Sequence, residues 1–194
     1  MTKRIVVGIS GSSGPIYGIR LLEVLSKIPK VETHLILSES AEISIRLENK
    51  NWTRKKVEAL AHKVHSPSNI AASISSGSFQ TCGMVIAPCS MKTLGNIAHS
   101  TGDNLLTRAA DVTLKERRRL ILLVRETPLH LGHLRNMVAV TEMGGVILPP
   151  IPAFYHQPKT IQDLIDHTIG KVLDILGLEH HLFQRWESPR STVE

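Results

Sequence analysis

The sequence is poor in aromatic residues and cysteine and has no long apolar run, and each shortage excludes a class of protein. Aromatic side chains make up 4% of the 194 residues, so the bases of single-stranded nucleic acid would find few rings to stack on. The 2 cysteines, Cys82 and Cys89, fit neither a CxxC redox pair nor a zinc ribbon. The longest apolar runs, such as residues 84–87, fall far short of the roughly 20 residues that a membrane helix needs. We therefore expect no nucleic-acid partner and no membrane span.

Signals for secretion and for metal binding are also missing. Residues 1–4, Met-Thr-Lys-Arg, lead into a short apolar stretch, without the long apolar segment and cleavage site of a secretory signal. We therefore expect a cytoplasmic protein whose thiols are reduced. The 10 histidines form no H-x-x-x-H pair on a convincing helix, and Asp163 and Asp166 have no further acidic neighbours. The sequence predicts no metal site.

The overall amino-acid composition is that of a globular protein with a basic surface. Hydrophobic residues make up 42% of the chain, enough for one core, and Lys plus Arg (23) exceed Asp plus Glu (17). The positive balance favours an anionic partner.

Apolar periodicity alternates between strands and helices along most of the chain. The expected strands are residues 4–9, 33–37, 84–87, 120–124 and 146–148. The expected helices are residues 15–27, 38–47, 52–64, 91–98, 104–118, 131–143 and 161–176. This alternation predicts a parallel sheet with helices on both faces and with its ligand at the carboxyl ends of the strands. We expect one α/β domain over residues 1–178 and a C-terminal extension over residues 179–194.

Three predicted strands are followed by segments that suit a phosphate group. Residues 8–14 read Gly-Ile-Ser-Gly-Ser-Ser-Gly, and their glycines and hydroxyls precede a predicted helix. Residues 88–93, Pro-Cys-Ser-Met-Lys-Thr, stand in the same place after another strand, and Ser38 follows a third. A tight turn without a ligand is the alternative for the glycine loop, and a plain helix cap explains Ser38 equally well. Two such loops on one sheet favour the binding interpretation.

Charged residues form a second candidate group. Arg125 and Glu126 close the strand that follows the basic run around Lys115, and strand ends in such sheets face the ligand. A structural ion pair is the alternative. Four further residues are undistinguished on their own: Glu48, Arg108, Tyr155 and Lys171.

Taken together, these segments resemble the UbiX-type flavin prenyltransferases, including the subgroup encoded alongside UbiD-like phenolic-acid decarboxylases. The resemblance covers about residues 4–178 and rests on the segments 11–14, 88–93, 103–112, 114–118, 125–129 and 148–155. It implies a flavodoxin-like (Rossmann-like) single domain in a homo-oligomer, commonly a dodecamer. It also implies that the chain attaches a dimethylallyl group from dimethylallyl monophosphate to N5 and C6 of reduced FMN. The product, prenylated FMN, would serve a UbiD-like decarboxylase.

The resemblance also assigns site residues. It implies FMN binding by Gly11, Ser12, Ser13, Ser38, Ser90, Met91, Lys92, Thr93 and Arg125. It implies binding of the prenyl phosphate by Arg108, Tyr155 and Lys171, and catalytic roles for Glu48, Lys115 and Glu126. Many relatives have arginine where Lys171 stands, and lysine keeps the charge but lacks the two-pronged guanidinium.

The residue types suit the reaction, because breaking the allylic carbon–oxygen bond leaves charge on a departing phosphate that fixed cations stabilise. Glu126 is a candidate proton donor to that phosphate, and the phosphate or Glu48 is a candidate acceptor of the proton lost at ring closure. Two alternatives remain at this point. One is an FMN-dependent cysteine decarboxylase with a similar Pro-x-Ser-x-x-Thr loop, and the other is a non-enzymatic flavin carrier.

Overall fold

The computed structural model describes residues 2–186, and the chain divides into two compact units, Met1–Pro150 and Ile151–Glu194. The first unit contains a six-stranded sheet in the order β3-β2-β1-β4-β5-β6, and all its pairings are parallel. Its strands are β1 (Lys3–Ile9), β2 (Val31–Leu37), β3 (Lys63–His65), β4 (Gly83–Cys89), β5 (Arg119–Val124) and β6 (Val146–Ile147). The predicted parallel sheet is confirmed.

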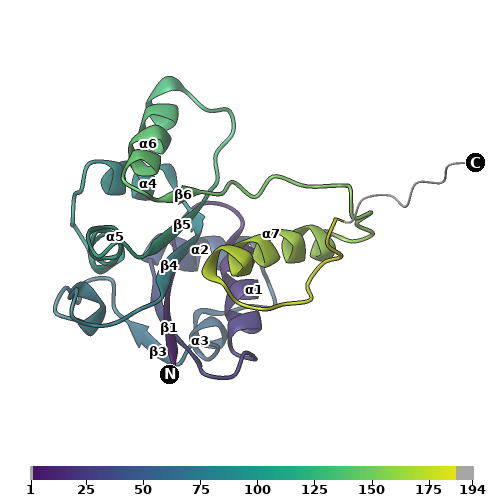
Figure 1. Ribbon diagram of the computed structural model, residues 1–194, viewed down its shortest axis with the longest axis horizontal. Coiled ribbons are helices and arrows are strands. Elements are labelled where there is room, and N and C mark those ends of the chain that lie inside the picture. The colour runs from purple at the N-terminus through teal and green to yellow at the C-terminus, as the bar shows by residue number, and fades with distance from the viewer. Residues whose placement is uncertain (1, 187–194) are drawn as a thin grey trace, which may run out of the picture. The chain divides into compact units, whose positions relative to one another are not determined.

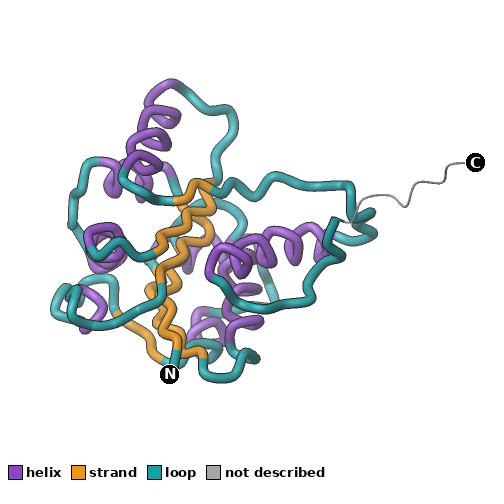
Figure 2. Tube along the Cα trace, viewed as in Figure 1, coloured by secondary structure: helices purple, strands orange, loops and turns teal. Residues whose placement is uncertain are grey.

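Helices connect the strands of this unit and cover both faces of the sheet (Figure 1). They are α1 (Pro15–Leu25), α2 (Glu39–Glu48), α3 (Arg54–Glu58), α4 (Met91–Ala98), α5 (Leu105–Lys115) and α6 (Leu131–Glu142), with a short 3₁₀ turn at Ser73–Ser75. The first three join strands on one side of β1, and the last three join strands on the other side, so right-handed crossovers place the two groups on opposite faces. Figure 2 shows the strands running between these helical layers.

The core lies on the central strands. Val7, Leu35, Val85 and Ile121 are fully buried, because strands covered on both faces carry apolar side chains in both directions. No helix within residues 2–186 is long and apolar enough to cross a membrane.

The second unit contains α7 (Ile161–Leu176), which has the bounds that the periodicity predicts. Thr160 and Asp163 form a capping box at its start, and Gly177, with φ +67°, ends it. The predicted extension over residues 179–194 lies partly outside the described residues, so its boundary stays a prediction.

One predicted element is wrong. The sequence predicts a single helix over residues 52–64, but Thr53 caps a helix of only 5 residues, and Lys63–His65 form β3. This edge strand pairs in register with residues 34–36 of β2. A three-residue strand carries almost no periodicity of its own, so the pairing with β2 decides its conformation.

Candidate active site

The candidate site lies where the strand order of the sheet reverses. From β1 the chain steps outward to β2 and β3, and it then returns to β4 on the other side of β1. The loops that follow β1 and β4 therefore diverge to opposite faces and leave a crevice at the carboxyl edge, the usual ligand site of doubly wound sheets. Both loops singled out from the sequence, residues 8–14 and 88–93, lie at this reversal.

Ser10 fastens these two loops together. Its buried hydroxyl donates to the Pro88 carbonyl at 2.9 Å and accepts from the Ser90 backbone N–H at 2.8 Å. The Ser10 N–H also donates to the Pro88 carbonyl at 3.2 Å. Three hydrogen bonds thus hold the start of the Ser90 loop against the end of β1, so their relative position is fixed before any ligand arrives.

Helix caps shape two of the surrounding loops. The Ser90 hydroxyl accepts from the Thr93 N–H at 3.3 Å and lies 3.0 Å from the Thr93 hydroxyl, at the start of α4. Ser38 caps α2 in the same way by accepting from the Ala41 N–H at 3.1 Å. Both helices therefore direct their N-terminal ends at the carboxyl edge of the sheet, where the helix dipole favours an anion.

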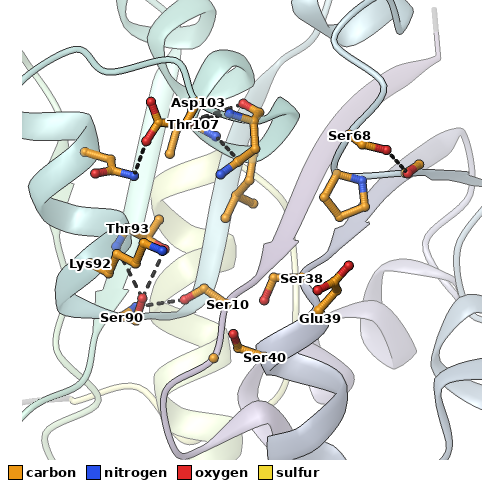
Figure 3. A pocket seen from close by; sticks show the side chains of 16 residues that line it. Ser10, Ser38, Glu39, Ser40, Ser68, Ser90, Lys92, Thr93, Asp103 and Thr107 are labelled. Carbon is orange, nitrogen blue, oxygen red and sulfur yellow. Dashed lines mark hydrogen bonds between the residues drawn. The ribbon is translucent and has the colours of Figure 1, made fainter.

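Together the loops enclose a cavity of about 590 Å³ (Figure 3). It is lined by Ser10, Gly11, Ser38, Glu39, Ser40, Ser66, Pro67, Ser68, Ser90, Lys92, Thr93, Asn96, Asp103, Asn104, Leu106 and Thr107. Most of these side chains are hydroxyls or amides, and Lys92 is the only cation among them. The volume is that of a pocket for a cofactor-sized molecule.

Two features of the glycine loop, one beside the cavity and one in its lining, are compatible with a flavin nucleotide. The Ser12 hydroxyl oxygen is buried and has no hydrogen-bond partner within the described residues, so it is free to bond a ligand. At Gly11 an added Cβ would collide with the Cβ of Ser40, so only glycine lets the loop approach α2 this closely. Phosphate and ribityl hydroxyl groups match such a set of donors and acceptors.

The predicted FMN residues are only partly brought together. Gly11, Ser38, Ser90, Lys92 and Thr93 line the cavity, whereas the remaining four do not. Those four are Ser12 and Ser13 of the glycine loop, Met91, whose side chain packs against the core, and the exposed Arg125. No observation tests their contact with FMN, so these assignments stay predictions.

Two predicted catalytic acids lie beside the loops of the cavity, although neither lines it. Glu48, at the end of α2, accepts from the Gly14 N–H at 2.8 Å and so contacts the glycine loop. Glu126 follows Arg125, whose N–H donates to the Cys89 carbonyl at 3.1 Å, directly before the Ser90 loop. The Glu126 carboxylate accepts from the N–H of Thr127 at 3.0 Å.

Lys115 does not join this group within one chain. It ends α5, and Asn104 and Thr107 at the opposite end of that helix line the cavity. Its ammonium group pairs with Glu116 at 2.5 Å. The chain then enters β5, whose length of about 16 Å separates the amino edge of the sheet from the carboxyl edge. A lysine side chain does not span that distance.

The three predicted phosphate ligands have partners of their own. Arg108 lies on α5 and pairs with Asp111 at 2.7 Å. In the second unit, the Tyr155 hydroxyl lies 2.8 Å from Nε2 of His167, and Lys171 approaches Asp174 at 4.0 Å. Residues 167 and 171 are one turn apart on α7, so their side chains share a face.

Cys89 lies at the end of β4, next to the Ser90 loop. Complete burial raises the pKa of its thiol, which is therefore protonated at neutral pH. A protonated thiol is a poor nucleophile, so Cys89 acts as an apolar packing group here.

Sequence reasoning missed more than half of the cavity lining. Ser10 stands inside the glycine motif, and its place directly after a strand was a usable signal. Asn104 begins the predicted helix over residues 104–118 and Asp103 directly precedes it, and neither follows a predicted strand. Ser66 and Ser68 follow β3. Because the sequence did not predict that strand, it gave no signal that these serines lie at the carboxyl edge of the sheet.

The reversal of strand order, the paired loops and the polar cavity define a doubly wound nucleotide-binding protein of the flavodoxin-like type. The Flavoprotein family model matches residues 1–176. The chain is 57% identical over 187 residues to the flavin prenyltransferase UbiX of Escherichia coli K12, which covers 95% of this chain and 98% of the relative. The flavin prenyltransferase UbiX of Thauera aromatica is 56% identical and covers 94% of this chain and 93% of the relative. The chain belongs to the Flavoprotein family and, within it, to the UbiX-type flavin prenyltransferases.

Solved structures agree with this membership. A structure described as AnUbiX (PadA1) in complex with FMN and dimethylallyl pyrophosphate has a TM-score of 0.95 at 47% identity and covers 98% of this chain and 100% of that chain. A dodecameric FMN-dependent UbiX-like decarboxylase from Escherichia coli O157:H7 has a TM-score of 0.93 at 47% identity and covers 95% of this chain and 100% of that chain. The FMN-dependent cysteine decarboxylase TvaF, at 18% identity and a TM-score of 0.58, shares the fold alone. The predicted family and fold class are confirmed.

Proposed function

We propose that this chain transfers a dimethylallyl group from dimethylallyl monophosphate to reduced FMN and releases prenylated FMN. The observation that carries this proposal is the polar cavity at the strand-order reversal, whose hydroxyls and helix N-termini suit a flavin nucleotide. The 57% identity to a flavin prenyltransferase supports the same reaction. FMN is thus both cofactor and substrate, and its reduced ring supplies the electron-rich atoms that accept the allyl group.

The cations and hydroxyls act on the leaving phosphate. As the carbon–oxygen bond breaks, negative charge grows on the phosphate oxygens, and groups that bind them more tightly at that stage lower the barrier. Arg108, Lys171 and the Tyr155 hydroxyl are the residues we assign to this task. In this proposal these three residues stabilise the charge on the leaving phosphate without a metal ion.

Two carboxyl groups are assigned to proton transfer. Glu126 stands at the end of β5, beside the loop that starts α4, and we assign it the proton given to the phosphate. The proton lost when the new ring closes then goes to the phosphate or to the Glu48 carboxylate, which already lies at the glycine loop.

A role for Lys115 requires a second copy of the chain, because within one chain it lies at the other edge of the sheet. We therefore propose a homo-oligomer in which a neighbouring subunit completes the site. The dodecameric relative supports an assembly of this kind, and twelve copies is the number we expect. Light scattering of the FMN-bound protein tests it, and a monomer that binds FMN tightly would contradict it.

The product needs a recipient. Prenylated FMN is a cofactor rather than an end product, and we propose a UbiD-like decarboxylase as the enzyme that takes it. A cytoplasmic location, in which FMN and reduced thiols are both at hand, stays part of this proposal.

Mass spectrometry of the flavin tests the proposed reaction directly. The protein is incubated without oxygen with reduced FMN and dimethylallyl monophosphate, and the flavin is then extracted. We expect a flavin heavier by one five-carbon unit, and the pyrophosphate serves as the comparison donor. Flavin recovered with unchanged mass would favour a carrier that binds FMN without modifying it.

A further inference from the structure

Tyr155 is held by a histidine that none of the assigned roles uses. Nε2 of His167 lies 2.8 Å from the Tyr155 hydroxyl, and the two rings meet edge to face, with centroids 5.5 Å apart. His167 is only 9% exposed. A buried imidazole this close to a phenol determines where the phenolic proton points.

The ring of His167 cannot rotate freely. The His156 ring stacks on it at 4.7 Å with an interplanar angle of 9°, and the Phe183 ring lies at 4.7 Å with a tilt of 49°. Rings packed in this way fix the plane of the imidazole and therefore the direction of its bond to Tyr155.

His167 is uncharged at neutral pH. Burial lowers the pKa of His167, and the nearby His156 and Lys171 lower that pKa further. A neutral imidazole carries one N–H, so its Nε2 atom either donates to the phenolic oxygen or accepts the phenolic proton.

The two arrangements have opposite consequences for an anion. If Nε2 accepts, the phenol spends its only proton on His167 and presents lone pairs to the substrate. If Nε2 donates, the phenolic O–H stays free and can donate to a phosphate oxygen, and the hydrogen bond from His167 makes that proton a better donor. Lys171, one turn further along α7, adds positive charge on the same face.

We infer that His167 is a positioning residue that donates from Nε2 to the Tyr155 hydroxyl and keeps the phenolic proton directed at the prenyl phosphate. This role rests on the proposed function of Tyr155 as a phosphate ligand. His167 itself does not touch the substrate.

A double-mutant cycle tests the inference. His167→Phe keeps a ring in the stack but removes the donor, and His167→Gln restores an N–H donor. Each variant is made in the parent and in a Tyr155→Phe background, and KM for dimethylallyl monophosphate, kcat and FMN affinity are measured. His181→Gln, at an exposed histidine of the same unit, is the matched control.

We expect His167→Phe to raise KM by roughly fivefold to tenfold, the effect of losing one hydrogen bond between uncharged groups, while FMN affinity stays at the parental value. His167→Gln should recover most of that loss. In the Tyr155→Phe background the His167 substitutions should have no further effect, because their route to the phosphate is gone.

The contrary outcomes are separable. An equal rise in KM in both backgrounds, or a parental KM for His167→Phe while Tyr155→Phe raises KM, overturns the inference alone. A parental KM for Tyr155→Phe overturns the assigned role of Tyr155 and the inference with it. If His167→Phe fails to fold, solid-state ¹⁵N NMR of the parent can show which nitrogen of His167 carries the proton. A proton on Nδ1 instead of Nε2 contradicts the inference.

Discussion

Around the cavity, hydroxyl side chains are hydrogen-bonded to neighbouring backbone, whereas the cations assigned to phosphate binding and catalysis are half exposed and paired with carboxylates. The buried Ser10 hydroxyl makes two hydrogen bonds, and Ser90 caps its own helix. By contrast, the side chains of Arg108, Lys115 and Lys171 are 40%, 46% and 52% exposed.

This difference separates the cavity, whose contacts lie within one chain, from the cations, whose proposed partners are a phosphate or another subunit. Exposed ion pairs of this kind contribute little stability, and their partners can be exchanged at low cost when a phosphate or another subunit arrives. The hydroxyl-lined cavity, in contrast, is held by hydrogen bonds within the first unit. We therefore expect substitutions at the cations and acids to change the reaction and substitutions at the Ser10 contact to change flavin binding.

The largest effect is expected from Glu126→Gln. The amide keeps the shape of the side chain but cannot supply a proton, so prenylation should slow by at least about a hundredfold. FMN affinity should stay nearly parental, because Glu126 does not line the cavity. Single-turnover flavin spectra measure the rate, with Glu142→Gln on the exposed face of α6 as the control. A parental rate would return Glu126 to a structural role.

Lys171→Met should have the next largest effect. Removing one cation from a partly desolvated phosphate should raise the half-saturating concentration of dimethylallyl monophosphate by about tenfold to a hundredfold. Lys171→Arg should be tolerated, because a guanidinium can bind two phosphate oxygens at once. Anaerobic steady-state kinetics measure both variants beside Lys159→Met. If Lys171→Met matches the parent, this lysine merely faces solvent.

Ser10→Ala tests the contact between the end of β1 and the Ser90 loop beside the cavity. The change removes the hydroxyl that bonds the Pro88 carbonyl and the Ser90 N–H, and leaving that half-buried N–H without its partner costs about 1 kcal/mol. The displaced Ser90 loop should weaken FMN binding by about tenfold, with a smaller change in kcat. Flavin fluorescence measures the affinity, and Ser26→Ala, at an exposed hydroxyl, is the control. Parental FMN affinity would show that the contact is not needed.

Local chemistry was sufficient to predict much of this molecule. Ser38 caps the helix expected after it, and α7 keeps its predicted bounds because its apolar stripe and capping box agree. The reversal of strand order brings the two predicted phosphate loops together. These features depend on residues close in sequence or on general rules of α/β topology.

Features that depend on distant partners could not be predicted in this way. β3 exists because residues 34–36 of β2 pair with it. The contact of Ser10 with Pro88 spans 78 positions in the sequence. The partner of Lys115 in the proposed oligomer lies on another chain, which no motif in this sequence identifies.

A buried histidine pair lies on β2 and β3, at one edge of the sheet, and has none of the assigned roles. Nδ1 of His34 and Nε2 of His65 are 2.9 Å apart, and the other nitrogen of His34 lies 3.0 Å from the Glu32 carboxylate. Arg4 and Lys63 add positive charge nearby. Burial, the His34 ring and Lys63 lower the pKa of His65 to about 4, and burial lowers the pKa of His34 despite the carboxylate.

The smallest effect is expected from this pair and concerns stability. A histidine with a lowered pKa binds its proton more readily in the unfolded chain, so the folded state should lose stability as pH falls from 6.5, the value for a free histidine, toward 4. His65→Gln should reduce that loss. The drop in Tm between pH 8 and pH 5 should therefore be smaller by a few degrees in His65→Gln than in the parent. Thermal unfolding at both pH values measures it, with His99→Gln, at an exposed histidine, as the control. Equal acid sensitivity in parent and His65→Gln would show that other groups, such as Glu32, govern unfolding in acid.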